Sequence, residues 1–297
     1  MKQYENISIW RTTACAGVLL YHIFHKIYNG QQNAWMTFGK YGVLFFFMIT
    51  GFLAFASLDI RGNIWLYWKK RMIRILPLYL IVQFLWLIIF SVENGSFQLG
   101  WELLTKDFAG GTWTVWVTMV FYFLAPFFAK FINTWMRAGI AFLISFIPRY
   151  LFTMFGFSVL DNTWQYLCFC MQGVLIYYIF KENKEKISVL FFACILIGLQ
   201  LTDSTDDYFI YSVIFMIIFI CTKDVSVRNK VIEKIVAAID KYSYAVFLFH
   251  PVVFRIVPGQ PVFLFVLCGI TGTFALSIAG YYWIDKPLKK VLLKKES

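Results

Sequence analysis

Two polar side chains that could do chemistry interrupt the first apolar stretch of the chain, residues 7–24. They are Arg11 and His22 in ISIWRTTACAGVLLYHIF. Eleven residues turn a helix by about 1100° and rise about 16 Å, so both side chains leave nearly the same face. A charge near a bilayer centre costs about 2.5–3.5 kcal/mol, so this face is expected to meet protein or water. Imidazole can serve as a general base, and guanidinium binds anionic oxygens.

The other two histidines, His25 and His250, are expected at the same depth as His22. Three imidazoles could ligate zinc together with a water molecule. However, neither a carboxylate nor a cysteine cluster accompanies them, so we predict no metal site. A structural histidine bonded to a neighbouring helix is the simpler interpretation for each of them on these grounds alone.

A second candidate site lies in WLYWKKRMIRILPLYL, where Arg71 and Arg74 are three residues apart. In a helix they share a face, and paired guanidiniums suit phosphate oxygens. Such basic clusters also mark the cytoplasmic end of a span or bind anionic lipid, and this alternative stays open.

The composition is that of a membrane protein. Of the 297 residues, 60% are hydrophobic, 21% aromatic and only 14% charged, whereas a soluble domain carries about 25% charged residues. The net charge of +11 does not indicate nucleic-acid binding, because the basic residues flank apolar stretches. The six cysteines lie within apolar stretches and are interpreted as small hydrophobic residues.

We therefore predict an all-α polytopic bundle of about ten transmembrane helices in a single domain, residues 1–297, with no separate soluble domain. Basic residues gather in alternate loops, which predicts that both termini are cytoplasmic. Arg149 is expected to snorkel to the outer interface. The predicted spans are 7–24, 38–56, 73–92, 112–132, 138–155, 163–180, 187–201, 208–222, 238–256 and 261–284.

Aromatic residues crowd the start of the fourth predicted span, GGTWTVWVTMVFYFLAPFF, and include Trp113 and Tyr122. Such rings usually form a belt at the membrane interface. They could also form a stacking surface for sugar rings, and the sequence does not decide between these alternatives.

Five segments, in order, resemble the acyltransferase-3 family of membrane proteins. They are the arginine–histidine pair of the first span, GVLFFFMITGFL, KKRMIRILPLY, SYAVFLFHP and the terminal YYWIDKPLKK. Together they cover the chain from end to end. The family's fold is a bundle of about ten transmembrane helices, which agrees with the count from apolar stretches.

The resemblance implies a multi-pass enzyme of the bacterial cytoplasmic membrane that transfers acetyl from cytoplasmic acetyl-CoA to a surface polysaccharide or its lipid-linked precursor. Acetyl-CoA is then a substrate, and no permanently bound cofactor is expected. Membrane lipids are the other expected partners. The resemblance assigns His22 as the catalytic residue and Arg71 and Arg74 to the donor. We expect Arg11 to help bind the donor. Trp113, Tyr122 and His250 are weaker candidates for the acceptor side.

One position departs from the family pattern. WTVWVTMVFY places Trp113, Phe121 and Tyr122 in register, but Thr118 stands where many members carry a glutamate. A mechanism that needs this carboxylate is therefore in doubt here. The alternative function is a transporter or flippase of lipid-linked sugars, which intramembrane charges would also suit. The lack of an evident inverted repeat and the arginine–histidine pair favour the enzyme.

Overall fold

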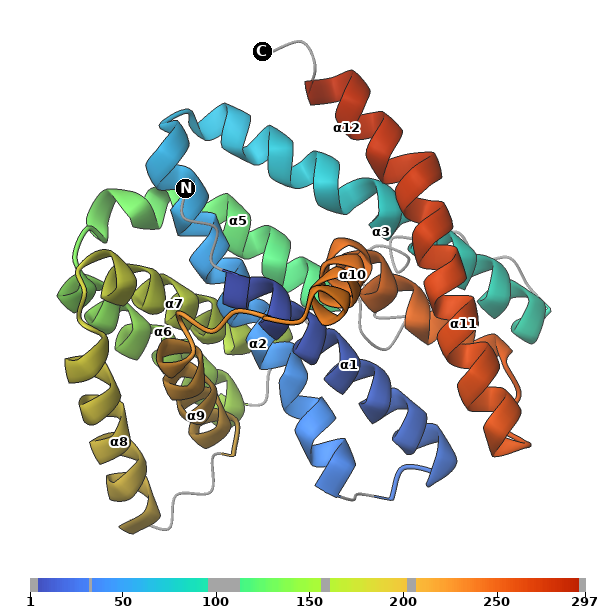
Figure 1. The fold of residues 1–297 in the computed structure, drawn as a ribbon, viewed down its shortest axis with the longest axis horizontal. Helices are drawn as coiled ribbons and strands as arrows, with labels where there is room; N and C mark the ends of the chain where they lie inside the picture. The colour runs from blue at the N-terminus through green and yellow to red at the C-terminus, as the bar shows by residue number, and fades with distance from the viewer. Residues whose placement is uncertain (1–4, 32–33, 96–112, 156–160, 202–206, 294–297) are drawn as a thin grey trace.

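The computed structural model describes residues 5–31, 34–95, 113–155, 161–201 and 207–293, and every regular element in these ranges is helical. Figure 1 shows the helices as one bundle with α1, α2 and α10 at its centre. The elements are α1 (Glu5–Ile27), α2 (Ala34–Arg61), α3 (Ile64–Asn94), α5 (Trp113–Phe131), α6 (Trp135–Phe155), α7 (Asp161–Lys181), α8 (Glu185–Leu201), α9 (Asp207–Cys221), α10 (Lys230–Ile256), α11 (Val262–Gly280), the π-helix η1 (Tyr281–Asp285) and α12 (Lys286–Leu293).

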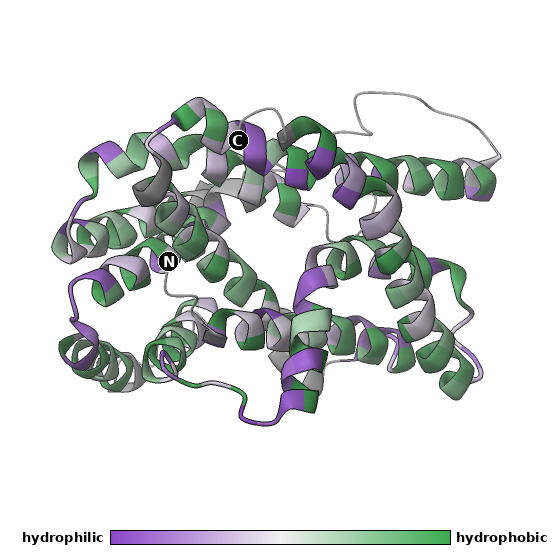
Figure 2. Ribbon diagram, turned by 45° about the horizontal axis from the view of Figure 1, so that its top comes forward, coloured by the Kyte–Doolittle hydropathy of each residue, from purple (hydrophilic) through white to green (hydrophobic). Residues whose placement is uncertain are grey.

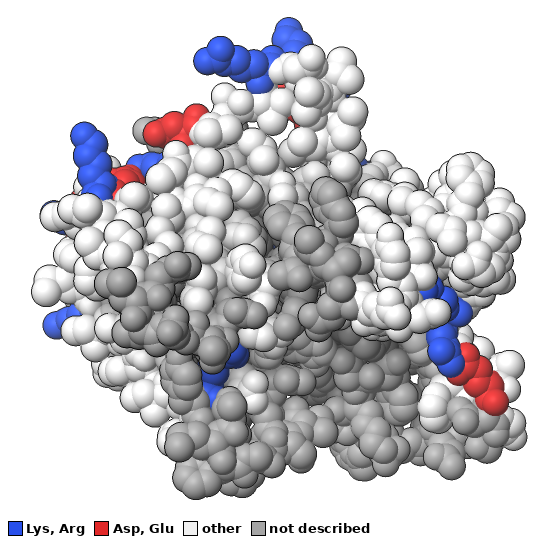
Figure 3. Space-filling model, turned by 90° about the horizontal axis from the view of Figure 1, so that it is seen from below, with Lys and Arg blue, Asp and Glu red and all other residues white. Residues whose placement is uncertain are grey.

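The helices have the hydropathy of membrane spans. Hydrophobic residues dominate the ribbons in Figure 2, and hydrophilic residues concentrate at helix ends and loops. Most of the described residues on the face in Figure 3 are uncharged, and the charged side chains among them stand in isolated groups. Five segments of the described residues are long and apolar enough to cross a membrane: Asn6–Ile27, Tyr41–Leu58, Ile64–Glu93, Trp113–Phe131 and Val262–Leu292.

Each of the ten predicted spans coincides with a helix, so the all-α prediction is confirmed. Ten membrane crossings and cytoplasmic termini remain predictions. Most helices begin a few residues earlier than predicted, and α3 and α10 begin nine and eight residues earlier, where each has an asparagine N-cap. Asn63 accepts from the Leu66 amide at 3.1 Å at the start of α3. Asn229 accepts from the Val231 amide at 2.8 Å at the start of α10.

Helices α1 and α10 pack side by side and run in the same direction. Near their first turns, the Thr12 hydroxyl donates to the carbonyl of Val236 at 3.2 Å. Near their last turns, the Lys26 ammonium donates to the carbonyl of Phe254 at 3.3 Å. Polar groups at equivalent depths on these two helices are therefore neighbours.

Helix α2 crosses α7 at very short range, and two glycines allow it. A Cβ atom on Gly51 would lie 1.8 Å from the Cys170 carbonyl oxygen, and one on Gly173 would lie 1.8 Å from that of Met48. Both neighbours are backbone atoms that cannot rotate away. Small residues at such crossings let helix backbones approach closely in membranes.

We predict that Gly173→Ala lowers the free energy of unfolding by about 1–3 kcal/mol or more, because the added methyl group forces the two backbones apart. Denaturant unfolding in detergent measures the change. Gly139→Ala is the matched control, since its nearest neighbour, a Leu175 side-chain carbon, would be 3.9 Å away. Equal stability of the two variants would contradict the close crossing.

Candidate active site

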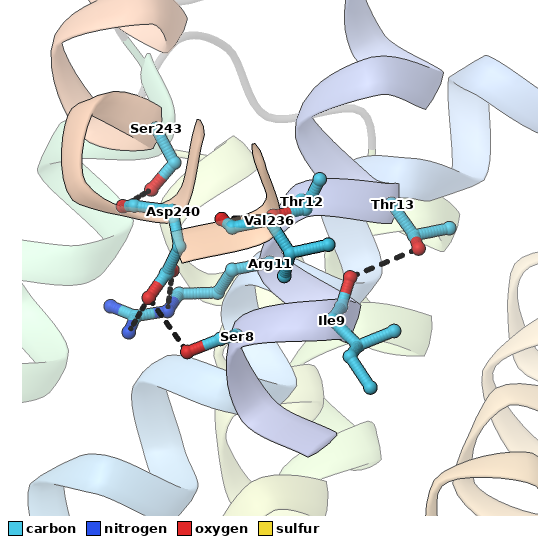
Figure 4. A network of polar contacts seen from close by, with 8 residues as sticks. All are labelled: Ser8, Ile9, Arg11, Thr12, Thr13, Val236, Asp240 and Ser243. Carbon is cyan, nitrogen blue, oxygen red and sulfur yellow. Dashed lines mark hydrogen bonds and ion pairs between the residues drawn. The ribbon is translucent and has the colours of Figure 1, made fainter. Parts of the chain in front are cut away.

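The Arg11 guanidinium forms an ion pair with Asp240, which connects α1 to α10 (Figure 4). Nε lies 2.7 Å from one carboxylate oxygen, and Nη2 donates to the other at 2.8 Å. The Ser8 hydroxyl donates to the same carboxylate at 2.9 Å. The side chains of Arg11 and Asp240 are only 20% and 13% exposed. The guanidinium is thus held by a carboxylate on another helix.

Asp240 is a residue that the sequence analysis missed. It precedes His250 by ten residues, much as Arg11 precedes His22 by eleven. This similar spacing is the feature of the sequence that could have pointed to Asp240. The spacing becomes informative only when α1 and α10 are known to be parallel neighbours, because the Arg11–Asp240 and His22–His250 contacts then fall at matching depths.

A cavity of about 110 Å³ contains the predicted donor-binding arginines. Helices α1, α2, α3, α5 and α10 contribute to its wall, so residues far apart in sequence meet here. Thr118, at the family's glutamate position, also lines it. The described residues that line this arginine cavity are Arg11, Val43, Phe46, Phe47, Ile49, Thr50, Leu53, Arg71, Arg74, Ile75, Thr114, Val115, Thr118, Tyr122, Ser243, Tyr244 and Phe247.

Arg71 is held in a fixed position in this cavity. Its Nη2 donates to the Leu53 carbonyl at 2.9 Å and to the Ser57 hydroxyl at 2.6 Å. Its guanidinium carbon lies 4.7 Å from the Tyr122 ring centre, a cation–π contact. Arg74 is exposed, at the edge of the same cavity. Tyr122 thus lines a different cavity from Trp113 and His250, about 13 Å along α5 from Trp113. Its role on the acceptor side stays a prediction.

A second cavity, of about 210 Å³, contains His22 together with Trp113 and His250. Besides the two histidines, its lining includes four aromatic residues with polar atoms, namely Tyr21, Trp113, Tyr166 and Tyr208. Trp113 and Tyr166 pack with ring centres 4.6 Å apart. The described residues that line this histidine cavity are Val18, Tyr21, His22, Gly39, Val43, Leu44, Trp113, Thr114, Tyr166, Tyr208, Phe247 and His250.

His22 and His250 contact each other inside this cavity, with ring centres 4.8 Å apart. His25 does not line it; it is exposed, and its ring packs against Tyr21. No group of three or more His, Cys, Asp or Glu side chains among the described residues is arranged to hold a metal ion.

The arginine cavity and the histidine cavity are neighbours. Val43 of α2, Thr114 of α5 and Phe247 of α10 line both of them. A layer of these side chains therefore lies between the arginines and His22. The sequence predicted the chemistry at each end but not the residues at this boundary.

Arg149 does not reach the interface as predicted; it is buried, with 9% of its surface exposed. Its guanidinium carbon lies 5.1 Å from the Tyr208 ring centre and 5.9 Å from that of Tyr166. Both tyrosines line the histidine cavity. Arg149 is thus held by cation–π contacts with residues that line the histidine cavity, and it does not snorkel to the interface.

The fold and the two cavities define a helical membrane protein with a basic site and an imidazole site in adjoining interior spaces. Comparison with protein-family models identifies it further. Residues 4–282 match the acyltransferase domain of the acyltransferase-3 family, and the chain belongs to this family. It is therefore a membrane acyltransferase. The transporter alternative is not supported. Neither curated proteins nor solved structures give a match.

We predict that a double-mutant cycle of Arg11→Met and Asp240→Asn gives a coupling energy of about 1–3 kcal/mol for unfolding in detergent, because each single change leaves the other group buried without its charged partner. The exposed pair of Arg255 and Glu93, with side chains 52% and 40% exposed, serves as the matched comparison and should couple more weakly. Additive effects of Arg11→Met and Asp240→Asn would contradict the ion pair.

Proposed function

We propose that the protein is an O-acetyltransferase of the bacterial cytoplasmic membrane. In this proposal it moves acetyl from cytoplasmic acetyl-CoA to a hydroxyl group of a surface polysaccharide or its lipid-linked precursor. His22 is the general base. The observation that carries the proposal is the common boundary of Val43, Thr114 and Phe247 between the arginine cavity and the histidine cavity.

The arginine cavity suits the nucleotide end of the donor. Coenzyme A carries several phosphate groups, and guanidinium forks bind phosphate oxygens well. Arg74 is exposed at the cavity edge, and Arg71 is oriented by Ser57 and the Leu53 carbonyl. In this proposal both arginines bind the donor phosphates. Arg11 has two nitrogens committed to Asp240, so its role is to fix the site's geometry and to offer its remaining donors.

The thioester end must then reach His22. Arg11 and His22 lie about 16 Å apart along α1. The pantetheine arm of coenzyme A is a thin chain on the order of this length, so the donor can span both cavities if it passes Val43, Thr114 and Phe247. Of these, Phe247 has the largest side chain, so the proposal requires that this side chain move aside when the donor binds.

At the histidine cavity the chemistry is acyl transfer. The acceptor hydroxyl oxygen attacks the thioester carbonyl carbon, and His22 takes the hydroxyl proton. The tetrahedral intermediate then collapses with cleavage of the carbon–sulfur bond. His22 returns its proton to the leaving thiolate, which restores the neutral imidazole. A base located away from the donor's side of the membrane allows a cytoplasmic donor to serve an external acceptor.

The aromatic lining of the histidine cavity suits a sugar acceptor. Trp113 and Tyr166 form a packed ring pair on its wall, and Tyr208 adds a third ring. Such rings offer flat apolar faces together with N–H and O–H groups at their edges. The hydroxyl-bearing ring of the acceptor would stack against Trp113 and direct one oxygen toward His22.

We predict that His22→Ala lowers acetyl transfer by about 10²–10⁴-fold, because it removes the general base. The measurement is acetyl-ester content of surface glycan by mass spectrometry and NMR, in cells that express each variant at equal membrane levels. His25→Ala, one turn further along the same helix and outside the cavity, is the matched control and should retain activity. A normal acetyl-ester content in cells that express His22→Ala would contradict the proposal.

A further inference from the structure

His250 has a hydrogen-bonding requirement that the described residues leave unmet. Its side chain is buried, with 1% of the residue exposed. Nδ1 lies 3.2 Å from the carbonyl oxygen of Val246, one turn earlier in α10. Because a carbonyl oxygen only accepts hydrogen bonds, Nδ1 carries the proton. In the neutral imidazole, Nε2 then holds a lone pair.

This Nε2 atom has no hydrogen-bond partner among the described residues. Leaving a buried acceptor unpaired costs about 1–3 kcal/mol, so such an atom calls for a functional explanation. Because His250 lines the histidine cavity, a group in that cavity could supply the missing donor.

His22 is the neighbour with the right chemistry. Three rings contact His250 in the described part of the chain, namely His22, Phe247 and Phe254, with centres 4.8, 5.8 and 5.8 Å away. The two phenylalanines have no polar hydrogen. A neutral imidazole has one N–H group and one lone pair, so His22 can donate to Nε2 of His250 with one nitrogen and act as a base with the other.

We propose that His250 is a positioning residue, whose Nε2 accepts the N–H of His22 during acyl transfer. This inference rests on the proposed function. The hydrogen bond selects the His22 tautomer whose free nitrogen faces the acceptor hydroxyl. It also stabilises the imidazolium that forms when His22 takes the hydroxyl proton. The orienting group beside the base in other acyl-transfer enzymes works by the same logic.

The proton balance is complete without any further reactant. The hydroxyl proton moves to His22 as the oxygen–carbon bond forms, and the same proton moves to the coenzyme A thiolate as the carbon–sulfur bond breaks. His250 keeps its Nδ1 proton on the Val246 carbonyl throughout. It neither gains nor loses a proton, which separates its role from that of His22.

The test compares His250→Gln with His250→Met in the full-length protein, purified in detergent and assayed for acetyl-CoA-dependent transfer to an acceptor glycan. The two side chains have nearly the same length, but only glutamine retains an acceptor atom near the position of Nε2. We expect the kcat of the methionine variant to fall about 100-fold, with the KM for acetyl-CoA unchanged. The kcat of the glutamine variant should be at least about tenfold higher than that of the methionine variant.

Thermal unfolding of both variants separates structure from mechanism, because a merely structural histidine would lower stability and activity together. Equal kcat values for two stably folded variants would overturn the role of His250. If the methionine variant alone unfolds, His250→Asn replaces it, because asparagine keeps an amide group but moves it closer to the backbone. Its kcat must then fall below that of the glutamine variant, or the inference is wrong.

The outcome also distinguishes this inference from the proposed function. Loss of transfer in His22→Ala with full activity in His250→Met would remove the positioning role and leave the acetyltransferase proposal intact. Full activity in His22→Ala would remove both. His25→Gln serves as the control for introducing an amide near this end of the bundle and should leave kcat unchanged.

Discussion

The ion pair between Arg11 and Asp240 is the interaction on which the site depends. It fixes the register of two parallel helices, α1 and α10, near their first shared turns. His22 lies eleven residues after Arg11 in α1, a rise of about 16 Å, and His250 lies ten residues after Asp240 in α10, a rise of about 15 Å. The register of the two helices therefore brings His22 against His250. One buried contact thus determines which side chains meet at another, because a helix transmits position rigidly over this distance.

The ion pair of Arg11 and Asp240 also lowers the energetic cost of placing charged groups inside a membrane protein. A lone guanidinium at this position would be costly to bury, and so would a lone carboxylate. Paired with Asp240, whose carboxylate also accepts from Ser8, the Arg11 guanidinium can line a cavity within an apolar exterior (Figures 2 and 4). Among the described residues, Arg71 and Arg74 are the arginines of this cavity that form no ion pair with a carboxylate.

Much of the fold could be predicted from the sequence, because apolar stretches of suitable length dictate helices. The sequence also singled out His22, Arg71 and Arg74, because their residue types are unusual in such stretches, and their roles stay predictions. Three contacts could not be predicted from the sequence. They are the ion pair of Arg11 with Asp240, the position of Tyr122 beside Arg71, and the burial of Arg149 under Tyr208. Each contact depends on which helices are neighbours and on how each helix is rotated about its own axis. The hydrophobic periodicity of a single helix contains no information about its neighbours. The close backbone contact of Gly173 with Met48 fixes how α7 lies against α2, which is a different pair of helices.

The central claim is that the donor's thioester reaches His22 from the arginine cavity. The most direct measurement is a cryo-electron microscopy structure with an unreactive thioether analogue of acetyl-CoA. The account predicts phosphates at Arg71 and Arg74, and the acetyl-bearing end beyond Val43, Thr114 and Phe247, next to the His22 ring. An analogue whose acyl end stays on the arginine side, or that binds elsewhere, would contradict it.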